Sequence, residues 1–190
     1  MMSNLGNDTG RAVFEHSLPS TIARPAPTAE RAVREKWIRD KYQHTFYVEP
    51  QPENGEPNEV RFLRAVRQSD YAAMLWCIAH KVDINFHDPD ENSVSALHIA
   101  VLVRSRTCTE QWQNSLSVVA PADRMSPTQN QNAPIVELLL LNGADADSRD
   151  SDAWTPLHHC ACHDFVNCAV VLIRYNAKLD RRDFDNKVRR

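Results

Sequence analysis

Six consecutive residues include five side chains of types that bind metal ions, three histidines and two cysteines. They are His158, His159, Cys160, Ala161, Cys162 and His163. Imidazole and thiolate groups are the ligands that zinc prefers in proteins. One hypothesis is therefore a metal-dependent enzyme built on this cluster. Against it, the five cysteines of the chain contain no pair with the C-x-x-C spacing of a zinc ribbon.

The residues just before the cluster suggest a different role for it. Thr155-Pro156 predicts the start of a helix, because threonine caps a helix and proline fits its first position. Cys160 and Cys162 then stand where small side chains pack, and a reduced thiol behaves as a small hydrophobe. We favour this structural interpretation and predict no catalytic residue, no metal ligand and no cofactor in the chain.

The cluster belongs to a segment that repeats itself once. The run from Asn142 to Asp147 is echoed by the run from Tyr175 to Asp180, which is 33 residues later (175 minus 142). An apolar stretch precedes each run, Ile135–Leu141 and Ala169–Ile173. This period, together with the T-P-L-H pattern from Thr155, is typical of ankyrin repeats, in which a β-hairpin precedes two helices.

Two further alignments extend the repeat toward the N-terminus. Residues 62–65 align with 97–100 and 157–160, and residues 81–85 align with 143–147. The sequence thus predicts a mainly α fold, an ankyrin-repeat helical solenoid of about three units over residues 59–186. Gly143 and Asn176 should end their helices in the left-handed conformation, with Lys81 in the same position of the first unit.

Two segments interrupt the pattern. Residues 49–58 contain three prolines and a glycine and are interpreted as a linker. Residues 104–133 are rich in Ser, Thr, Gln, Asn and Pro and are interpreted as a disordered insertion between two helices. Pro134 should open the helix that follows. The insertion is either a surface loop or a short docking or phosphorylation segment.

Residues 1–48 should form two helices, at about Thr9–His16 and about Thr28–Gln43. Thr28 is the expected cap of the second helix. Val33, Trp37, Ile38 and Tyr42 have helical spacing, so we expect them to form one apolar face that packs on another element.

Three stretches of this N-terminal part resemble the end of an Arf GTPase-activating domain. They are Leu5-Gly6-Asn7-Asp8 with Val13-Phe14-Glu15, then Pro25-Ala26-Pro27, and finally residues 35–42, which look like the closing E(K/R)xxIxxKY helix of that domain. In the family an ankyrin array often follows after a linker, which is the order seen here. The resemblance implies that residues 1–48 are two helices of a truncated GTPase-activating domain.

The sequence departs from this family at the catalytic centre. The resemblance implies a four-cysteine zinc finger and an arginine finger in the full-length protein, which would act on an Arf-type small GTPase. An arginine finger stabilises the charge of the transferring phosphoryl group. No cysteine precedes Cys77, and Arg11, Arg24 and Arg31 are not in matching positions. We therefore expect this chain to be no enzyme by itself, as in a truncated gene model, a partial clone, a splice form or an inactive remnant.

Composition narrows the class of partner and the compartment. The formal net charge is −3, so nothing favours nucleic acid. The sequence has no apolar run long enough to enter a membrane and no secretory signal. We expect a cytoplasmic chain with reduced cysteines, with the full-length protein peripheral to membranes in traffic or actin regulation.

The expected activity is recognition of another protein through hairpin tips and first helices. Seven residues are the candidates for this contact: Asp88, Asp90, Glu91, Arg149, Asp152, Trp154 and Asp164. Trp154 is either exposed for binding or packed across its own hairpin. The alternative to the GTPase-regulator hypothesis is a stand-alone ankyrin scaffold or adaptor that has no relation to GTPases.

Overall fold

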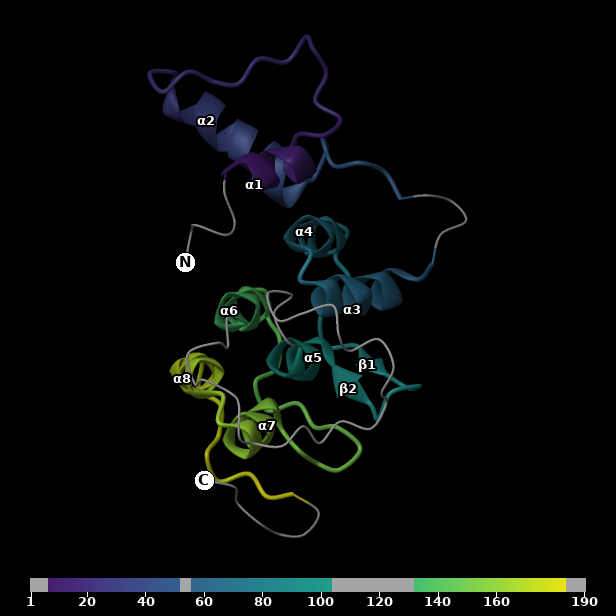
Figure 1. Cartoon of the computed structure of the whole chain (residues 1–190). Helices are drawn as coiled ribbons and strands as arrows, with labels where there is room; N and C mark the ends of the chain where they lie inside the picture. The colour runs from purple at the N-terminus through teal and green to yellow at the C-terminus, as the bar shows by residue number, and fades with distance from the viewer. Residues whose placement is uncertain (1–6, 52–55, 104–131, 184–190) are drawn as a thin grey trace. The chain divides into compact units, whose positions relative to one another are not determined.

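The computed structural model describes residues 7–51, 56–103 and 132–183, and most of their regular structure is helical (Figure 1). The chain divides into two compact units. The first unit contains the residues up to 65 together with 70–83, and the second contains 66–69 and the residues from 84 onward. The predicted insertion lies outside the described residues except for its last two positions.

The first unit contains the N-terminal helices and one helix pair. Its elements are α1 (Asn7–Phe14), α2 (Arg31–Ile38), the π-helix η1 (Arg39–Gln43), the larger part of α3 (Asn58–Gln68) and α4 (Tyr71–Ala79). The first N-terminal helix lies close to its predicted place. The second begins later than predicted because a turn, in which the Ala29 amide donates to the Ala26 carbonyl over 2.9 Å, holds Thr28 outside the helix. Glu30, not Thr28, is the N-cap residue.

A buried ion pair joins α1 to η1. The Lys41 ammonium donates to the Glu15 carboxylate over 2.6 Å, and the two side chains are only 9% and 6% exposed. The guanidinium of Arg24 donates to the other Glu15 oxygen over 2.7 Å. The Phe14 and Tyr42 rings lie 5.1 Å apart, measured between centroids. Residues that are distant in sequence therefore fold together in the N-terminal part.

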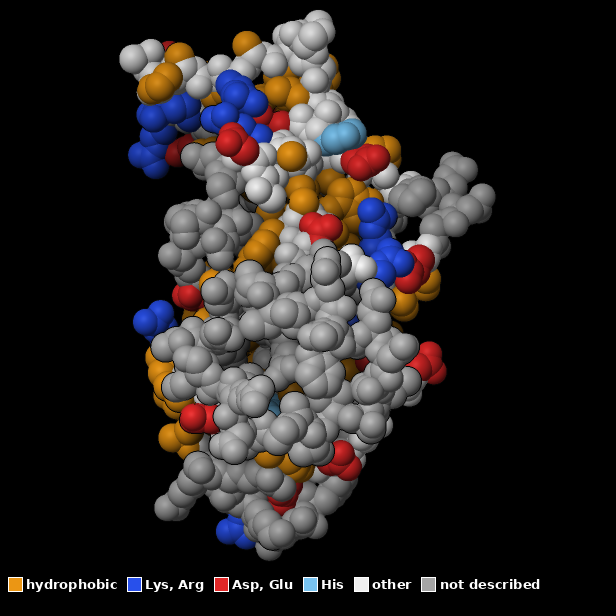
Figure 2. All heavy atoms as spheres, viewed as in Figure 1, with side chains coloured by type: hydrophobic (Ala, Val, Ile, Leu, Met, Phe, Trp, Pro, Cys, Tyr) orange, Lys and Arg blue, Asp and Glu red, His pale blue; other side chains and the backbone are white. Residues whose placement is uncertain are grey.

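The predicted apolar face of the second helix is wrong in one respect. Trp37 is half-buried and its ring stacks on that of Tyr47, with 5.6 Å between centroids. However, Val33, Ile38 and Tyr42 are 51%, 54% and 51% exposed. Val33 and Ile38 lie in α2, which has no buried residue, and Tyr42 lies beyond the change to a π-helix at Arg39, where the helical repeat differs. These positions therefore do not share one buried face. Lys, Arg and hydrophobic side chains together form the visible surface around α2 (Figure 2).

Helices α1 and α4 pack against each other within the first unit. The side chain of Asp70 caps α4 by accepting a hydrogen bond from the Ala73 amide over 3.1 Å. Met74 and Cys77 are fully buried on α4, and burial raises the pKa of the Cys77 thiol to about 11. The guanidinium of Arg61 lies 4.1 Å from the ring centroid of the buried Trp76. The first helix pair thus has its own small core.

Replacing Lys41 with methionine should lower the free energy of unfolding by about 1.5 kcal/mol, the lower end of the net contribution of a hydrogen bond to a charged group, because Glu15 loses one of its two cations. The remaining Arg24 contact limits the loss. The matched control is Arg31→Met, which removes an exposed i,i+4 contact to Glu35. This control should stay within about 0.5 kcal/mol of the parent. Urea unfolding followed by circular dichroism measures both variants, and equal losses would contradict the structural role of Lys41.

The second unit contains a hairpin and two helix pairs. Strands β1 (His87–Asp88) and β2 (Val94–Ser95) are antiparallel, with His87 opposite Ser95. The helices are α5 (Ala96–Leu102), α6 (Ala133–Leu141), α7 (Pro156–His163) and α8 (Val166–Arg174). Helix α5 contacts α7, and α6 contacts α8, so like helices of successive repeats lie side by side (Figure 1). The core between them contains the fully buried side chains Leu97, Ile135, Leu139 and Leu172.

Helix starts and ends of this unit follow the sequence closely. Pro134 stands in the first turn of α6, and Thr155 caps α7, which begins at Pro156. Gly143 and Asn176 have φ of 93° and 64°, which confirms their predicted left-handed conformation. Lys81, in the first unit, also has positive φ, 56°, although a lysine is less suited to it.

A repeated hydrogen bond fixes the register of successive loops. The Asn85 side chain accepts from the Asp145 amide over 2.8 Å, and the Asp147 side chain accepts from the Lys178 amide over 2.9 Å. Asn85 and Asp147 occupy aligned positions of their repeats, so the structure supports the alignment made from sequence. No helix among the described residues has the length and apolar character needed to cross a bilayer.

Candidate protein-recognition surface

Two loops of the second unit form one continuous surface. The first loop, residues 89–93, connects β1 to β2, and the second loop, residues 149–154, precedes α7. The Ser151 amide donates to the Asn92 carbonyl over 2.9 Å and joins the two loops. Asn92 and Ser93 both have positive φ, 49° and 51°, so the chain reverses sharply at the end of the first loop.

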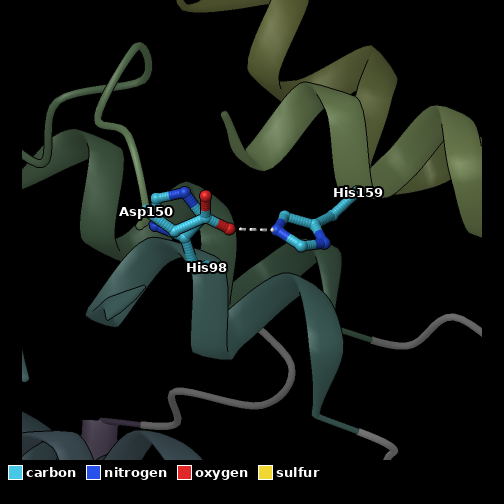
Figure 3. Close-up of side chains that lie close together, drawn as sticks. All are labelled: His98, Asp150 and His159. Atoms are coloured by element: carbon cyan, nitrogen blue, oxygen red, sulfur yellow. Dashed lines mark hydrogen bonds and ion pairs between the residues drawn. The ribbon is translucent and has the colours of Figure 1, made fainter. Parts of the chain in front are cut away.

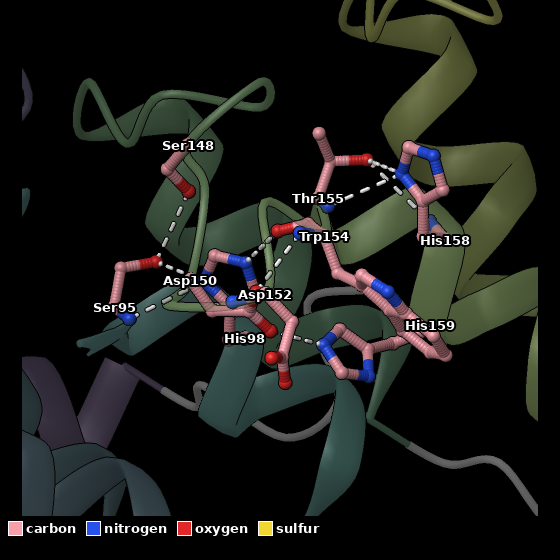
Figure 4. A network of polar contacts seen from close by, with 9 residues as sticks. All are labelled: Ser95, His98, Ser148, Asp150, Asp152, Trp154, Thr155, His158 and His159. Carbon is pink, nitrogen blue, oxygen red and sulfur yellow. Dashed lines mark hydrogen bonds and ion pairs between the residues drawn. The ribbon is translucent and has the colours of Figure 1, made fainter. Parts of the chain in front are cut away.

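His98, on α5, makes a hydrogen bond to the second loop (Figure 4). Its Nε2 lies 3.0 Å from the Trp154 carbonyl, which can only accept, so Nε2 carries the proton. Its Nδ1 therefore accepts from the Ser95 amide at 3.2 Å and from the Ser95 hydroxyl at 2.8 Å. That hydroxyl lies 3.1 Å from the Ser148 hydroxyl. His98 is fully buried and connects the first turn of α5 to the loop of the next repeat.

Asp150 shapes the second loop itself. One oxygen accepts from the amides of Asp152 and Trp154, at 3.0 and 2.9 Å, and the other accepts from His159 Nε2 at 2.9 Å. The Asp150 side chain is only 6% exposed. Burial lowers the pKa of His159, and the nearby Asp150 carboxylate opposes this effect. These contacts fix the backbone positions of Asp152 and Trp154 in the second loop.

His98, Asp150 and His159 are the one set of possible metal ligands found among the described residues (Figure 3). Their nearest ligand atoms lie within 4.8 Å of one another. Both nitrogens of His98 are occupied by hydrogen bonds to Ser95 and Trp154, so a metal could bind His98 only by breaking one of them. The hydrogen-bond network explains this arrangement better than a metal site does.

The sequence cluster that suggested zinc does not converge on one point. His159 turns to Asp150, whereas His158 Nδ1 lies 2.7 Å from the Thr155 hydroxyl. Cys160 is buried, which raises the pKa of its thiol, and Cys162 is exposed. The Nε2 of His158 is buried without a hydrogen-bond partner among the described residues, although His98 at the aligned position has one.

Five of the seven predicted binding residues are exposed to solvent. Asp90 and Glu91 are exposed in the first loop, and Arg149 and Asp152 in the second. Asp164 is exposed too, but it caps the far end of α7, which is about 12 Å long, and so does not join the loops.

Asp88 and Trp154 are both half-buried, which differs from the expected exposure of Asp88 and fits the packed alternative given for Trp154. Asp88 lies on β1, 3.2 Å from the guanidinium of Arg67. The indole of Trp154 packs on the ring of His159, with 5.0 Å between centroids. Trp154 is therefore in large part a packing residue of its own loop, and its edge contributes less to an exposed surface than expected.

Sequence analysis missed a hollow beside the first loop. It has a volume of about 490 Å³, and its lining combines charged and apolar side chains: Arg67, Asp90, Glu91, Asn92, Val94, Ile99, Leu102 and Val103. No sequence motif distinguishes the apolar members. Only the exposure of Leu102 at the last turn of α5 distinguishes them, and sequence spacing does not reveal it.

Comparison with known proteins places ankyrin repeats in this chain. A family model described as ankyrin repeats (three copies) matches residues 125–187. Protein phosphatase 1 regulatory subunit 27 from mouse is 27% identical over 169 residues, which is 88% of this chain and 84% of that protein. The putative ankyrin repeat protein FPV031 of fowlpox virus is 24% identical over 129 residues, so the chain spans 38% of that relative.

These matches agree with the helix pairs and confirm the predicted fold class, a mainly helical chain with ankyrin repeats. They also support the general prediction that the chain recognises proteins. Neither relative is named as a GTPase-activating protein.

Proposed function

Because the chain carries ankyrin repeats that present two joined loops, we propose that it is the protein-recognition region of a regulator of Arf-type small GTPases. The observation that carries the GTPase assignment is the surface of α2 and η1. Val33, Ile38 and Tyr42 are half exposed there, and Phe46 just after η1 is 66% exposed. A short segment with this many exposed apolar side chains is typical of an element that packs on a further domain.

The geometry of the N-terminal part supports the same proposal. Glu15 ends the first of the three stretches that resemble the GTPase-activating domain, and Lys41 belongs to the third, residues 35–42. Their ion pair is buried and direct, so the two motifs form one folded piece instead of two unrelated matches. In the proposed parent protein, a zinc finger N-terminal to this piece would cover the exposed apolar side chains.

The chain itself would not catalyse GTP hydrolysis. The arginine finger and the zinc ligands of the family have no counterpart among its residues, since its first cysteine is Cys77. Catalysis by such regulators depends on a cation placed at the transferring phosphoryl group. The proposed contribution of this chain is to select the protein to which the regulator is brought.

A scaffold without any relation to GTPases is the second candidate. Similarity to a phosphatase regulatory subunit covers 169 residues, more than residues 59–186 can provide, so it includes part of the N-terminal segment. The packing of α1 on α4 within the first unit also fits helices that belong to the array. On this proposal the partner is a phosphatase catalytic subunit.

Two measurements separate the candidates. The transcript is sequenced upstream of the Met1 codon, where the GTPase proposal expects two C-x-x-C pairs followed by an arginine codon. GTP hydrolysis by an Arf protein is then measured with this chain and with the extended protein, and only the extended protein should accelerate it. An in-frame stop codon upstream without those cysteines, together with binding to the catalytic subunit of protein phosphatase 1, would establish the scaffold instead.

A further inference from the structure

The hollow beside the first loop has an apolar floor. This floor consists of the apolar lining residues Val94, Ile99, Leu102 and Val103, and the last two stand at the end of α5. Leu102 is 38% exposed, so part of this floor already meets solvent. The volume of about 490 Å³ exceeds one large side chain, and pockets that bind small molecules or anchor residues span about 300–1,000 Å³.

The mouth of the hollow carries an excess of negative charge. Arg67 is the single cation among the described lining residues, and two carboxylates already engage it, Asp88 at 3.2 Å and Glu91 at 2.5 Å. Asp90 is exposed and has no ion-pair partner within the described part of the chain. The lining carboxylates Asp90 and Glu91 and the neighbouring Asp88, which lies outside the lining, together with the one guanidinium give these described residues a net charge of −2.

The second loop extends this acidic surface. Asp152 is exposed there, and the bond between Ser151 and Asn92 keeps its loop beside the first one. Both loops are held before any partner arrives, the first by the Arg67 ion pairs and the second by His98 and Asp150. A preformed site avoids much of the ordering cost of binding.

We propose that this hollow binds a basic-apolar segment of a partner protein. An apolar side chain of the segment would contact Val94, Ile99 and Leu102. A lysine or arginine within a few residues of it would pair with Asp90 and with the part of Glu91 that faces solvent. The proposal rests on the protein-recognition function above and adds the chemistry of the partner.

The charges discriminate between possible partners. An acidic segment would have to approach the carboxylates of Asp90 and Glu91, and like charges that face each other across an interface weaken binding. A purely apolar segment would leave the mouth carboxylates facing it without a counter-charge. Only a segment with both an apolar anchor and a cation uses the floor and the mouth together.

The test is a selection of random peptides displayed on phage against the immobilised full chain. Enriched peptides should contain an apolar residue with lysine or arginine nearby. Their dissociation constants, measured by fluorescence anisotropy, should rise about tenfold in Asp90→Lys and in Leu102→Asp. Asp90 and Leu102 lie at the surface, so these substitutions should leave the circular dichroism spectrum unchanged.

Asp164→Lys is the matched control, because it makes the same charge change at an exposed carboxylate on the far end of α7. It should leave the affinity within about twofold, which is the size of a weak surface effect. Enrichment of acidic or purely apolar peptides overturns the proposal, as does binding that Asp90→Lys does not change. A selection that enriches no peptide overturns it too, while the hydrolysis and phosphatase-binding measurements above still test the wider function separately.

Discussion

Replacing His98 with alanine is expected to lower the free energy of unfolding by about 3 kcal/mol. The side chain is fully buried, and it makes the hydrogen bond that joins α5 to the Trp154 carbonyl of the next repeat. Its removal leaves that carbonyl and the Ser95 amide without their partner and opens a cavity in the core. Unsatisfied buried groups cost about 1–3 kcal/mol each, and the cavity adds to this.

The chain offers a matched control in His158. It occupies the aligned position of the next repeat, is also buried, and pairs with Thr155 through Nδ1 as His98 does with Ser95. Its Nε2, however, has no hydrogen-bond partner in the part of the chain that the structure describes. His158→Ala should therefore cost about 1 kcal/mol less than His98→Ala, the net contribution of one hydrogen bond.

Urea unfolding gives both losses, and hydrogen exchange shows where they act. In His98→Ala, exchange should rise in residues 94–103 and in 149–155, because the bond links these two segments. In His158→Ala, the segment 94–103 should keep its protection. Equal losses for the two variants would mean that the bond to Trp154 contributes nothing and that burial alone explains the effect.

The helix boundaries of the second unit were predictable because their signals are local. Threonine before proline at 155–156 specifies a cap and a first turn, whatever the rest of the chain does. Gly143 and Asn176 likewise favour a backbone conformation on their own account. For the same reason the register of the repeats could be predicted from the sequence. The hydrogen bonds that Asn85 and Asp147 accept from the next loop agree with that register.

The parts that could not be predicted depend on contacts between distant residues. Nothing near Arg39 indicates a π-helix, and the buried pair of Glu15 and Lys41 joins positions 26 residues apart. Asp150 looked like one more loop carboxylate in the sequence. Its burial follows from His159 and from two amides of its own loop, and only the folded chain brings these groups together.

The candidate surface was predicted in part for the same reason. Exposed charge in hairpin loops follows from turn chemistry, so Asp90, Glu91 and Asp152 were found at the surface. The hollow brings together an arginine from the end of α3, residues of the first loop and a leucine from α5. No short sequence pattern connects them, which is why the sequence indicated charged loop tips but no pocket.

Stability is expected to fall by about 2 kcal/mol between pH 7 and pH 4.5 through His98 alone. Burial lowers the pKa of His98 to about 4, from an ordinary value of 6.5. The hydrogen bond to the Trp154 carbonyl and the Asp150 carboxylate oppose this shift, while His159 and His87 add to it. Below pH 6.5 His98 binds a proton in the unfolded chain but stays neutral in the folded chain. The contribution of His98 to the free energy of unfolding, which is complete above pH 6.5, is therefore lost as the pH falls toward 4.

The difference in the free energy of unfolding between the parent chain and His98→Ala isolates the effect of His98, because the carboxylates and the other histidines titrate in both chains. Urea midpoints measured from pH 7 to pH 4.5 should therefore converge, as the parent loses an advantage that the variant never had. Burial also lowers the pKa of His159, which gives it the same sign, and this contribution remains in both chains. Two parallel curves would show that His98 is protonated as easily in the folded chain as in water, which its burial and its bond to Trp154 argue against.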